Sequence, residues 1–392
     1  MKNSMQAIIL AAGKSTRFNS TTSKLLTSLC GQPIILFLIQ LCEQLEIDTT
    51  VVVGHDKEAI ISVISAHNTS IACTFITQKE QYGTGHALTV TAAEWHKDTI
   101  LVINGDMPLV TQNVIQELYR AHYKDEATIS FVSTKSNELT HSYGRVIEDE
   151  TSIRIIEAKD CLDTLEYSSV NAGIYLINKN FLNEYISSLD SNNASNEFYI
   201  TDLVALASNN GKKVTHVTAS FDHVRGINTF QELHSAEFIK NRQLIQYHIA
   251  HGVRFICPET TTLDATVTIA PETIIEPGVY LKGSTHIGKE CIIKAFSRIE
   301  NSILDDQVTI ESHSLLIDSY ISKELHLQPF TYIRNNNIIS PCTHAHKTQE
   351  LPVTTSITKS HVSSSATHEY AMDQFSFIGA RRVNNDIPFD EQ

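Results

Sequence analysis

The sequence lacks any apolar run approaching the roughly 20 residues that a membrane-spanning helix requires. Residues 1–6 also lack the extended apolar stretch and cleavage site of a secretory leader. Positively charged residues are fewer than negatively charged ones: the sequence has 30 Lys and Arg and 44 Asp and Glu, which gives a net charge of −14. Such a surface repels phosphate polymers and anionic membranes. We therefore expect a cytoplasmic protein with no nucleic-acid and no membrane partner, whose phosphate chemistry depends on local basic groups.

The seven cysteines are scattered, odd in number and without any CxxC spacing. A disulfide framework or a thiolate metal site would show a more regular pattern, so we expect reduced, structural thiols. What is present is the composition of a soluble globular protein, with 42% apolar and 19% charged residues among 392. That length is sufficient for two or three domains.

Short β-rich runs alternate with amphipathic stretches from residue 6 to about residue 238. The β-rich runs lie at 7–10, 50–53, 99–103, 127–132, 172–177 and 214–217, and the amphipathic stretches include 34–45, 57–64 and 114–122. This alternation predicts an α/β domain in which helices cover a mostly parallel sheet. Ligands of such sheets bind beyond the carboxyl ends of the strands. A helix over 230–251 follows.

A six-residue recurrence begins at about residue 266. One row contains Val267, Thr273, Val279, Thr285, Cys291, Ser297, Ile303 and Thr309, and a second row contains Ile269, Ile275, Leu281, Ile287, Ile293 and Ile299. A left-handed parallel β-helix requires this period, because each triangular coil has three faces with an inward aliphatic side chain on each. We predict such a β-helix, with ordinary alternating strands as the alternative, and expect the repeat to decay beyond Asp318.

These patterns divide the chain into four parts. We expect a sheet domain over residues 1–229, a linker helix over 230–252 and a left-handed β-helix over 253–339. Residues 340–392 are predicted to be a degenerate or poorly ordered segment, because Ser, Thr and His dominate its first half and no hexad phase is visible.

The segment 10–17, Leu-Ala-Ala-Gly-Lys-Ser-Thr-Arg, directly follows the first predicted strand. Its small residues let a backbone turn approach an anion, while Lys14, Arg17 and the later Lys24 supply positive charge. The spacing is not that of a P-loop. Asp106 follows another predicted strand, where a carboxylate can hold a hard cation. On local sequence alone, a solvated basic loop and a plain turn residue remain as alternatives.

The blocks of this sequence resemble those of a known family. LAAGKSTRF, followed by Lys24 and by Gly-Gln-Pro at 31–33, resembles the opening of sugar-nucleotide pyrophosphorylases. QKEQYGTGHA at 78–87 resembles a block of the bacterial bifunctional N-acetylglucosamine-1-phosphate uridylyltransferase/glucosamine-1-phosphate acetyltransferase family. Further blocks at 143–146, 156–160, 170–175, 197–202 and 226–228 follow in that family's order. The resemblance covers roughly residues 6–335 and implies a Rossmann-like nucleotidyltransferase domain before the β-helix.

The resemblance also implies roles for individual residues. The nucleotide would be contacted by Leu10, Ala11, Ala12, Gly13 and Lys14, and its uracil would be read by Gln78, Gly83 and Thr84. The ribose and phosphates would lie along Asn104, Gly105 and Asp106. The amino sugar would be held by Gly144, Glu157 and Asn171. Asp106 and Asn228 would bind Mg²⁺. Arg17 and Lys24 are the predicted catalytic residues, since they would neutralise charge that develops on the phosphates. Cys30 and His86 are expected to have packing roles.

The implied reaction joins UTP to N-acetylglucosamine 1-phosphate and releases pyrophosphate, which gives the activated sugar of peptidoglycan and lipopolysaccharide. No covalent nucleophile is needed, because positioning and charge neutralisation suffice. Another sugar-1-phosphate nucleotidyltransferase and a catalytically silent regulatory or scaffolding homologue remain as alternatives. The β-helix predicts a homotrimer.

The sequence departs from the family's pattern at several positions. Ser15 replaces a usual Gly, Ser23 a usual Pro and Thr229 a usual Asn, although none of these changes removes a charge that the transfer needs. In DQFSFIGA at 373–380, Gln374 stands where the acetyltransferase half has its catalytic His. Gln cannot act as a general base, so we expect no acetyltransferase activity.

Overall fold

The computed structural model describes residues 4–14, 18, 23–67, 69–135, 143–150, 152–161, 169–334 and 338–339. Ser15, Arg17, Gln374 and the whole predicted segment 340–392 lie outside the described residues. Within the described ranges, no helix is both long and apolar enough to cross a membrane.

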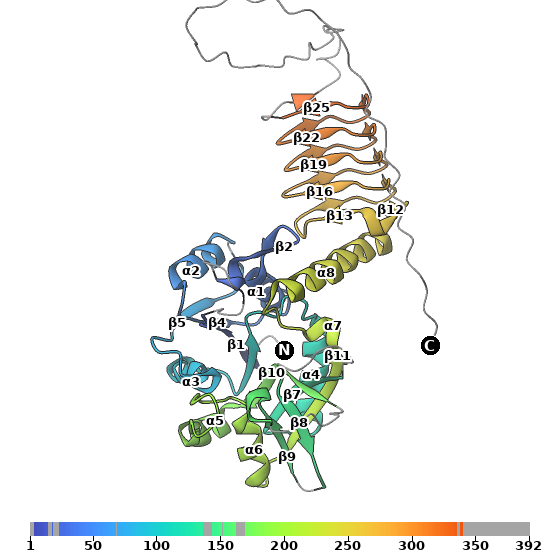
Figure 1. Cartoon of the computed structure of the whole chain (residues 1–392). Helices are drawn as coiled ribbons and strands as arrows, with labels where there is room; N and C mark the ends of the chain where they lie inside the picture. Colours follow the sequence, from blue (N-terminus) through green and yellow to red (C-terminus); the bar gives the residue numbers. More distant parts are fainter. Residues whose placement is uncertain are drawn as a thin grey trace, which may run out of the picture. The chain divides into compact units, whose positions relative to one another are not determined.

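The first half of the chain forms a twisted, mostly parallel sheet (Figure 1) with the order β11-β7-β10-β6-β1-β4-β5. Its strands are β1 (Met5–Ala11), β4 (Thr49–Val53), β5 (Cys73–Thr77), β6 (Thr99–Asn104), β7 (Ile129–Lys135), β10 (Val170–Asn178) and β11 (Val214–Ser220). Only β10 on this path runs antiparallel to its neighbours, and it also pairs with the hairpin of β8 (Arg145–Glu148) and β9 (Ile153–Ile156). The predicted mostly parallel α/β sheet is confirmed.

Helices cover both faces of this sheet because its strands are apolar on both sides. In β1, Ala7 and Ile9 enter one apolar cluster and Ile8 enters the other. The first cluster is completed by α1 (Ile34–Gln44), α2 (Lys57–Ala66) and α4 (Gln112–Lys124), and the second by α3 (Thr84–Thr89), α5 (Lys179–Tyr185) and α6 (Asp202–Asn209). The carboxyl ends of the strands are therefore the accessible edge of the sheet.

Short elements connect this sheet domain to the rest of the chain. A 3₁₀ turn, η2 (Lys24–Leu26), precedes the hairpin of β2 (Ser28–Leu29) and β3 (Gln32–Pro33), and α7 (Phe221–Val224) precedes α8 (Phe230–Ala250). Thr229 caps α8, since its side chain accepts a hydrogen bond from the backbone N–H of Glu232. Ser23 likewise caps η2. Two departures from the family pattern thus have local structural roles as helix caps.

The second half forms three five-stranded parallel sheets, which are the three faces of a left-handed β-helix (Figure 1). The first face contains β12 (Arg254–Phe255), β15 (Ile274–Ile275), β18 (Ile292–Ile293), β21 (Thr309–Ile310) and β24 (His326–Leu327). The second contains β13 (Thr262–Leu263), β16 (Tyr280–Lys282), β19 (Arg298–Glu300), β22 (Leu315–Ile317) and β25 (Tyr332–Ile333). The third contains β14 (Thr268–Ile269), β17 (His286–Ile287), β20 (Ile303–Leu304), β23 (Tyr320–Ile321) and β26 (Ile338–Ile339). The predicted β-helix is confirmed.

The predicted six-residue phase is wrong beyond Ser297. Ile303 is 45% exposed, and the inward positions are instead taken by Ser302 and Leu304, both fully buried. The step from Ile299 to Leu304 on the next face is one residue shorter than the earlier steps, and the strands still pair in register. One corner has lost a residue, so every later inward row moves by one position.

The expected decay of the repeat beyond Asp318 is also wrong. A second shortened step separates Leu316 from Ile321, after which the coils continue through Ile333 to Ile339. Ile321 is fully buried, so the apolar interior continues as well. The repeat changes phase twice and does not end at Asp318.

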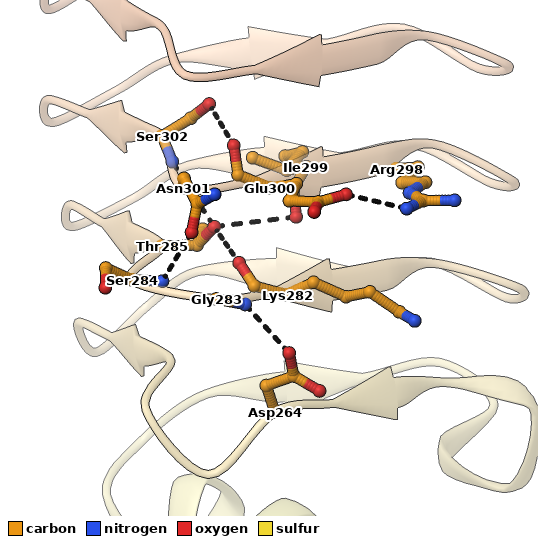
Figure 2. Close-up of polar contacts among 10 residues, drawn as sticks. All are labelled: Asp264, Lys282, Gly283, Ser284, Thr285, Arg298, Ile299, Glu300, Asn301 and Ser302. Carbon is orange, nitrogen blue, oxygen red and sulfur yellow. Dashed lines mark hydrogen bonds and ion pairs between the residues drawn. The ribbon is translucent and has the colours of Figure 1, made fainter. Parts of the chain in front are cut away.

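Hydrogen bonds between successive coils hold the corners of the β-helix. At the corner in Figure 2, Asp264 Oδ2 accepts a hydrogen bond of 2.8 Å from the backbone N–H of Gly283. One coil further on, Asn301 Oδ1 accepts one of 3.1 Å from the backbone N–H of Ser284. Gly283 is left-handed, with φ +61°, and a Cβ there would lie 1.9 Å from Asn301 Oδ1. A side chain at position 283 would therefore have to displace Asn301.

The β2–β3 hairpin contacts the first coil of the β-helix. The backbone N–H of Ala265 donates a hydrogen bond of 2.8 Å to the carbonyl of Cys30. Gly31 has φ +83°, and a Cβ at that position would lie 2.3 Å from Cγ of Asp264. This close approach requires glycine at the tip of the hairpin.

Candidate active site

The predicted nucleotide loop begins where β1 ends. Ala11 and Ala12 are buried, Leu10 is half-buried, and Gly13 and Lys14 are exposed. A Cβ added to Gly13 would meet no atom within 4 Å. The loop therefore passes from the packed edge of the sheet into open space, where a ligand can approach its backbone.

The residues predicted to read the base lie around the start of α3. Gln78 follows β5 and is only 3% exposed. Its Nε2 lies 3.2 Å from the carbonyl oxygen of Gly83 and 3.0 Å from His86 Nδ1. Thr84 Oγ1 accepts a hydrogen bond of 3.1 Å from the backbone N–H of Ile200. The structure thus brings Gln78 and Gly83 together, and it reveals a contact to His86 that sequence reasoning missed.

Lys24 lies between the two predicted metal ligands. Its Nζ is 2.5 Å from Asp106 Oδ2 and 2.8 Å from Asn228 Oδ1. The side chains of Lys24 and Asp106 are only 14% and 17% exposed. The carboxylate and the amide oxygen therefore converge on one positive charge at a largely enclosed point.

Backbone contacts hold this arrangement. Gly105 donates its N–H to the carbonyl of Leu10 at 2.9 Å, which fixes Asp106 beside the end of β1. Ile227 donates its N–H to the carbonyl of Asp106 at 2.9 Å, which places Asn228 next to that carboxylate. A Cβ at Gly226 would lie 3.4 Å from Asp106 Oδ1. Glycine there keeps the surroundings of the carboxylate open.

A cavity of about 710 Å³ opens beside these residues. Its walls include seven predicted site residues, namely Thr84, Asn104, Asp106, Gly144, Glu157, Asn171 and Asn228. The other predicted site residues that the structure describes do not line it, although Lys24 reaches two of its wall residues. Lys159 and Tyr199 also line the cavity and were not predicted, even though both belong to recognised sequence blocks. Lys159 supplies a cation and donates to Ser195 Oγ at 3.1 Å.

Polar groups from three segments meet in the lining of this cavity. Glu157 Oε1 accepts a hydrogen bond of 2.9 Å from Thr201 Oγ1. Asn171 Nδ2 donates to the hydroxyl of Tyr175 at 2.6 Å, and the Asn171 N–H donates to the carbonyl of Gly144 at 2.8 Å. The three residues predicted to hold the amino sugar therefore lie together, and buried partners orient the side chains of Glu157 and Asn171.

Burial shifts several ionisation equilibria here. It raises the pKa of the Glu157 carboxyl, and the hydrogen bond from Thr201 offsets part of that shift. It also raises the pKa of Tyr143 to about 12, so this hydroxyl stays neutral, accepting a hydrogen bond of 2.9 Å from the Gly226 N–H. The pKa of the Cys30 thiol rises to about 12, again through burial. Cys30 is therefore unsuited to be a nucleophile.

The donor set fits a hard divalent cation. Among the described residues, no group of three or more His, Cys, Asp and Glu side chains could hold a metal alone. Asp106 and Asn228 nevertheless offer one carboxylate and one amide oxygen to a shared point. Mg²⁺ is commonly bound by one or two protein oxygens, with substrate phosphates and water completing the octahedron. The two residues thus suit a metal that arrives with a nucleotide.

Comparison with known proteins identifies the family. A MobA-like NTP transferase domain matches residues 7–180, and a GMPPB C-terminal domain matches residues 263–370. Bifunctional protein GlmU of Clostridium botulinum (strain 657 / Type Ba4) is 32% identical over 335 residues, which cover 84% of this chain and 72% of the relative. Bifunctional protein GlmU of Alkaliphilus metalliredigens is 33% identical over 338 residues, with the same coverage of both chains. The chain belongs to the bifunctional GlmU family.

The GlmU family assignment makes the sheet domain a nucleotidyltransferase domain of the sugar-1-phosphate class. Among solved structures, a UDP-glucose pyrophosphorylase complexed with UDP-glucose aligns with 62% of this chain and 99% of its own, at 16% identity and a TM-score of 0.49.

Proposed function

We propose that this protein is a UDP-N-acetylglucosamine pyrophosphorylase. It transfers the uridylyl group of UTP to N-acetylglucosamine 1-phosphate and releases pyrophosphate. The observation that carries the proposal is the convergence of Lys24, Asp106 and Asn228 beside a cavity that Glu157 and Asn171 also line. The first group suits phosphates and a metal, and the second suits a hydroxylated, amide-bearing sugar.

The chemistry needs little from the protein beyond charge and position. A phosphate oxygen of the sugar phosphate attacks the α-phosphorus of UTP, a new P–O bond forms, and the bond to pyrophosphate breaks. Lys24 and Arg17 stabilise the negative charge on the transferring phosphoryl group. Mg²⁺, held by Asp106 and Asn228, would neutralise phosphate charge when bound. Leu10, Ala11, Ala12, Gly13 and Lys14 hold the triphosphate at the end of β1, and Asn104 and Gly105 hold the ribose side.

Selection of the substrates follows from the two ends of the site. Gln78, Gly83 and Thr84 read uracil, while Gly144, Glu157 and Asn171 bind the acetylated amino sugar. The carboxylate of Glu157 can accept from sugar hydroxyls, and the amide of Asn171 can pair with the N-acetyl group. The product would supply peptidoglycan and lipopolysaccharide synthesis.

The decisive measurement is pyrophosphate release by purified protein with Mg²⁺, UTP and N-acetylglucosamine 1-phosphate. Asp106→Ala should lower kcat/KM by at least about a hundredfold, since it removes a charge used in the transition state. Asp98→Ala is the matched control, because that carboxylate is 97% exposed and lies outside the site. A panel of dTTP, CTP and other sugar phosphates tests whether the protein is instead another nucleotidyltransferase. Silence across the panel would support a regulatory or scaffolding role.

Two further parts of the proposal concern the second half. The chain is proposed to lack acetyltransferase activity because Gln374 replaces the expected histidine, so acetyl-CoA and glucosamine 1-phosphate should yield no N-acetylated product. It is also proposed to assemble as a homotrimer through the β-helix. Sedimentation equilibrium should then give three times the 43.7 kDa mass of one chain.

A further inference from the structure

Gln78 is placed to read a ligand at the carboxyl edge of the sheet. It directly follows β5, and its N–H donates to the carbonyl of Val53, the last residue of β4, at 2.8 Å. Val53 in turn pairs with Ala11 at the end of β1. The Gln78 side chain therefore starts from the edge that carries the nucleotide loop.

The orientation of the Gln78 amide is determined by its partners. The carbonyl of Gly83 can only accept, so the NH₂ group of Gln78 must face it across 3.2 Å. The second hydrogen of Nε2 then points at His86 Nδ1, 3.0 Å away, which must accept it. No hydrogen bond to Gln78 Oε1 is found within the part of the chain that the structure describes. The carbonyl oxygen is thus left as an acceptor for a ligand.

Both partners of Nε2 are themselves fixed. Gly83 has φ +103°, and a Cβ there would lie 2.5 Å from the carbonyl oxygen of Phe198. The His86 ring, in the first turn of α3, packs against Tyr82 and Phe198 with centroid separations of 5.3 and 6.5 Å. His86 is therefore a rigidly held hydrogen-bond acceptor, in addition to its role in packing.

We infer that His86 is a positioning residue that makes the site prefer uracil to cytosine. This inference rests on the proposed role of Gln78 as the base reader. Uracil carries a donor at N3 and cytosine an acceptor, so an amide whose Oε1 faces N3 of the base pairs with uracil and opposes cytosine. Rotation of the amide would reverse the preference, but it would point Oε1 at the Gly83 carbonyl and at the lone pair of His86 Nδ1.

Removing the acceptor of His86 should weaken this preference without abolishing it, because the Gly83 carbonyl remains. His86→Leu should reduce the ratio of UTP to CTP affinity by about fivefold or more. His86→Asn should restore most of the ratio, since its side-chain oxygen can occupy the place of Nδ1. His96→Leu is the control, because His96 is an exposed histidine whose ring contacts Glu94 and Asp48.

Calorimetric binding of UTP and CTP with Mg²⁺, without sugar phosphate, measures this ratio independently of turnover. A purely structural role of His86 would weaken both nucleotides equally and leave the ratio unchanged, which would overturn the inference while the proposed reaction stands. A wild-type protein that binds both nucleotides equally would overturn it too. A ratio that falls in His86→Leu and returns in His86→Asn supports it, even if pyrophosphate release fails.

Discussion

The Lys24 ammonium lies at the point where Asp106 and Asn228 converge, with contacts of 2.5 and 2.8 Å. Sequence reasoning assigned this lysine to the phosphates and the other two residues to the metal. Asp106 and Asn228 cannot bind a metal while the Lys24 ammonium occupies the point between them. A metal that binds Asp106 and Asn228 must displace the ammonium, which then becomes available to a triphosphate.

Lys24→Ala should therefore have opposite effects on metal binding and on turnover. Without nucleotide, Mn²⁺ affinity measured by electron paramagnetic resonance should rise by about threefold or more, because a competing charge is gone. Pyrophosphate release should fall by at least about a hundredfold. Lys57→Ala, whose side chain is 42% exposed and pairs with Glu58, should change neither quantity. Unchanged Mn²⁺ affinity in Lys24→Ala would contradict the competition.

Asp202, the first residue of α6, makes stability depend on pH. Burial, together with the charges of Asp190 and Asp160, raises its pKa from 3.8 to about 6. Below pH 3.8 the Asp202 carboxyl is protonated in both the folded and the unfolded state, so it does not affect the free energy of unfolding. As the pH rises from 3.8 to about 6, Asp202 loses its proton in the unfolded state before it does so in the folded state. The folded state is thus penalised increasingly over this window.

Asp202→Asn should remove that penalty. At pH 7 we expect a gain of about 1 kcal/mol in the free energy of unfolding, after discounting for partial exposure, and no gain below pH 4. Urea unfolding at several pH values measures it. Asp98→Asn, at an exposed position, should show no gain, and a gain for Asp202→Asn that is equal at pH 4 and pH 7 would refute the assignment.

Individual residues could be predicted only as far as their local chemistry allowed. Asp106 at a strand end was recognisable, but nothing local to Asn228 indicates a ligand, and only the order of family blocks paired the two. The contact from His86 to Gln78 depends on the turn at Gly83, whose geometry is set by the distant Phe198. Lys159 was missed because its only signal was its place in a recognised block.

At the scale of elements, the corners of the β-helix combine left-handed backbone with bonds between coils. Gly283 has φ +61° and faces Asn301, whereas Gly211 has φ +65° with no atom within 4 Å of a Cβ. Comparing substitutions at these two glycines separates the cost of backbone strain from the cost of steric crowding, because a Cβ would meet a neighbouring side chain only at Gly283.

Gly283→Ala should cost about 2 kcal/mol or more, since a left-handed non-glycine residue is strained and the Asn301 side chain must also move. Gly211→Ala should cost only about 1 kcal/mol. Thermal unfolding followed by circular dichroism compares them. In the double variant Gly283→Ala/Asn301→Ala, the part of the stability loss that is due to crowding should disappear. Equal costs for the two single variants would show that crowding has no effect.

Elements were more predictable than residues because period and propensity are local properties. The predicted strand at 99–103 corresponds to β6 and the helix at 230–251 to α8, each within one residue at either end. The phase of the β-helix failed after Ser297 because a strict six-residue count cannot detect a shortened corner. Burial of Ser302 in place of Ile303 shows that coil-to-coil pairing, not spacing, determines the inward rows.

At the scale of the whole molecule, the segment that carries Lys24 continues into a hairpin that contacts the β-helix. Cys30 accepts from Ala265, and Gly31 closely approaches Asp264, which itself accepts from Gly283. The catalytic half and the β-helix thus share one network of contacts. This network gives a physical reason for the two halves to unfold together.

Gly31→Ala should disturb that coupling. A Cβ must displace Asp264, so we expect a loss of about 1–3 kcal/mol and separate unfolding transitions in place of one. Trp95, the sole tryptophan and only 7% exposed, reports the sheet domain by fluorescence, while far-ultraviolet circular dichroism reports the whole chain. In Gly211→Ala, the unfolding transitions reported by fluorescence and by circular dichroism should coincide. Coincident transitions in Gly31→Ala would show that the contact does not couple the halves.

The shortened corners of the β-helix have a consequence for changes in chain length. In most cores, deleting one codon within a repeat would misplace every side chain that follows. Here each strand takes its register from the coil below it, so the downstream residues simply resume inward and outward alternation after the gap. We therefore expect a corner of this β-helix to absorb a single-codon deletion locally, with the downstream interior intact.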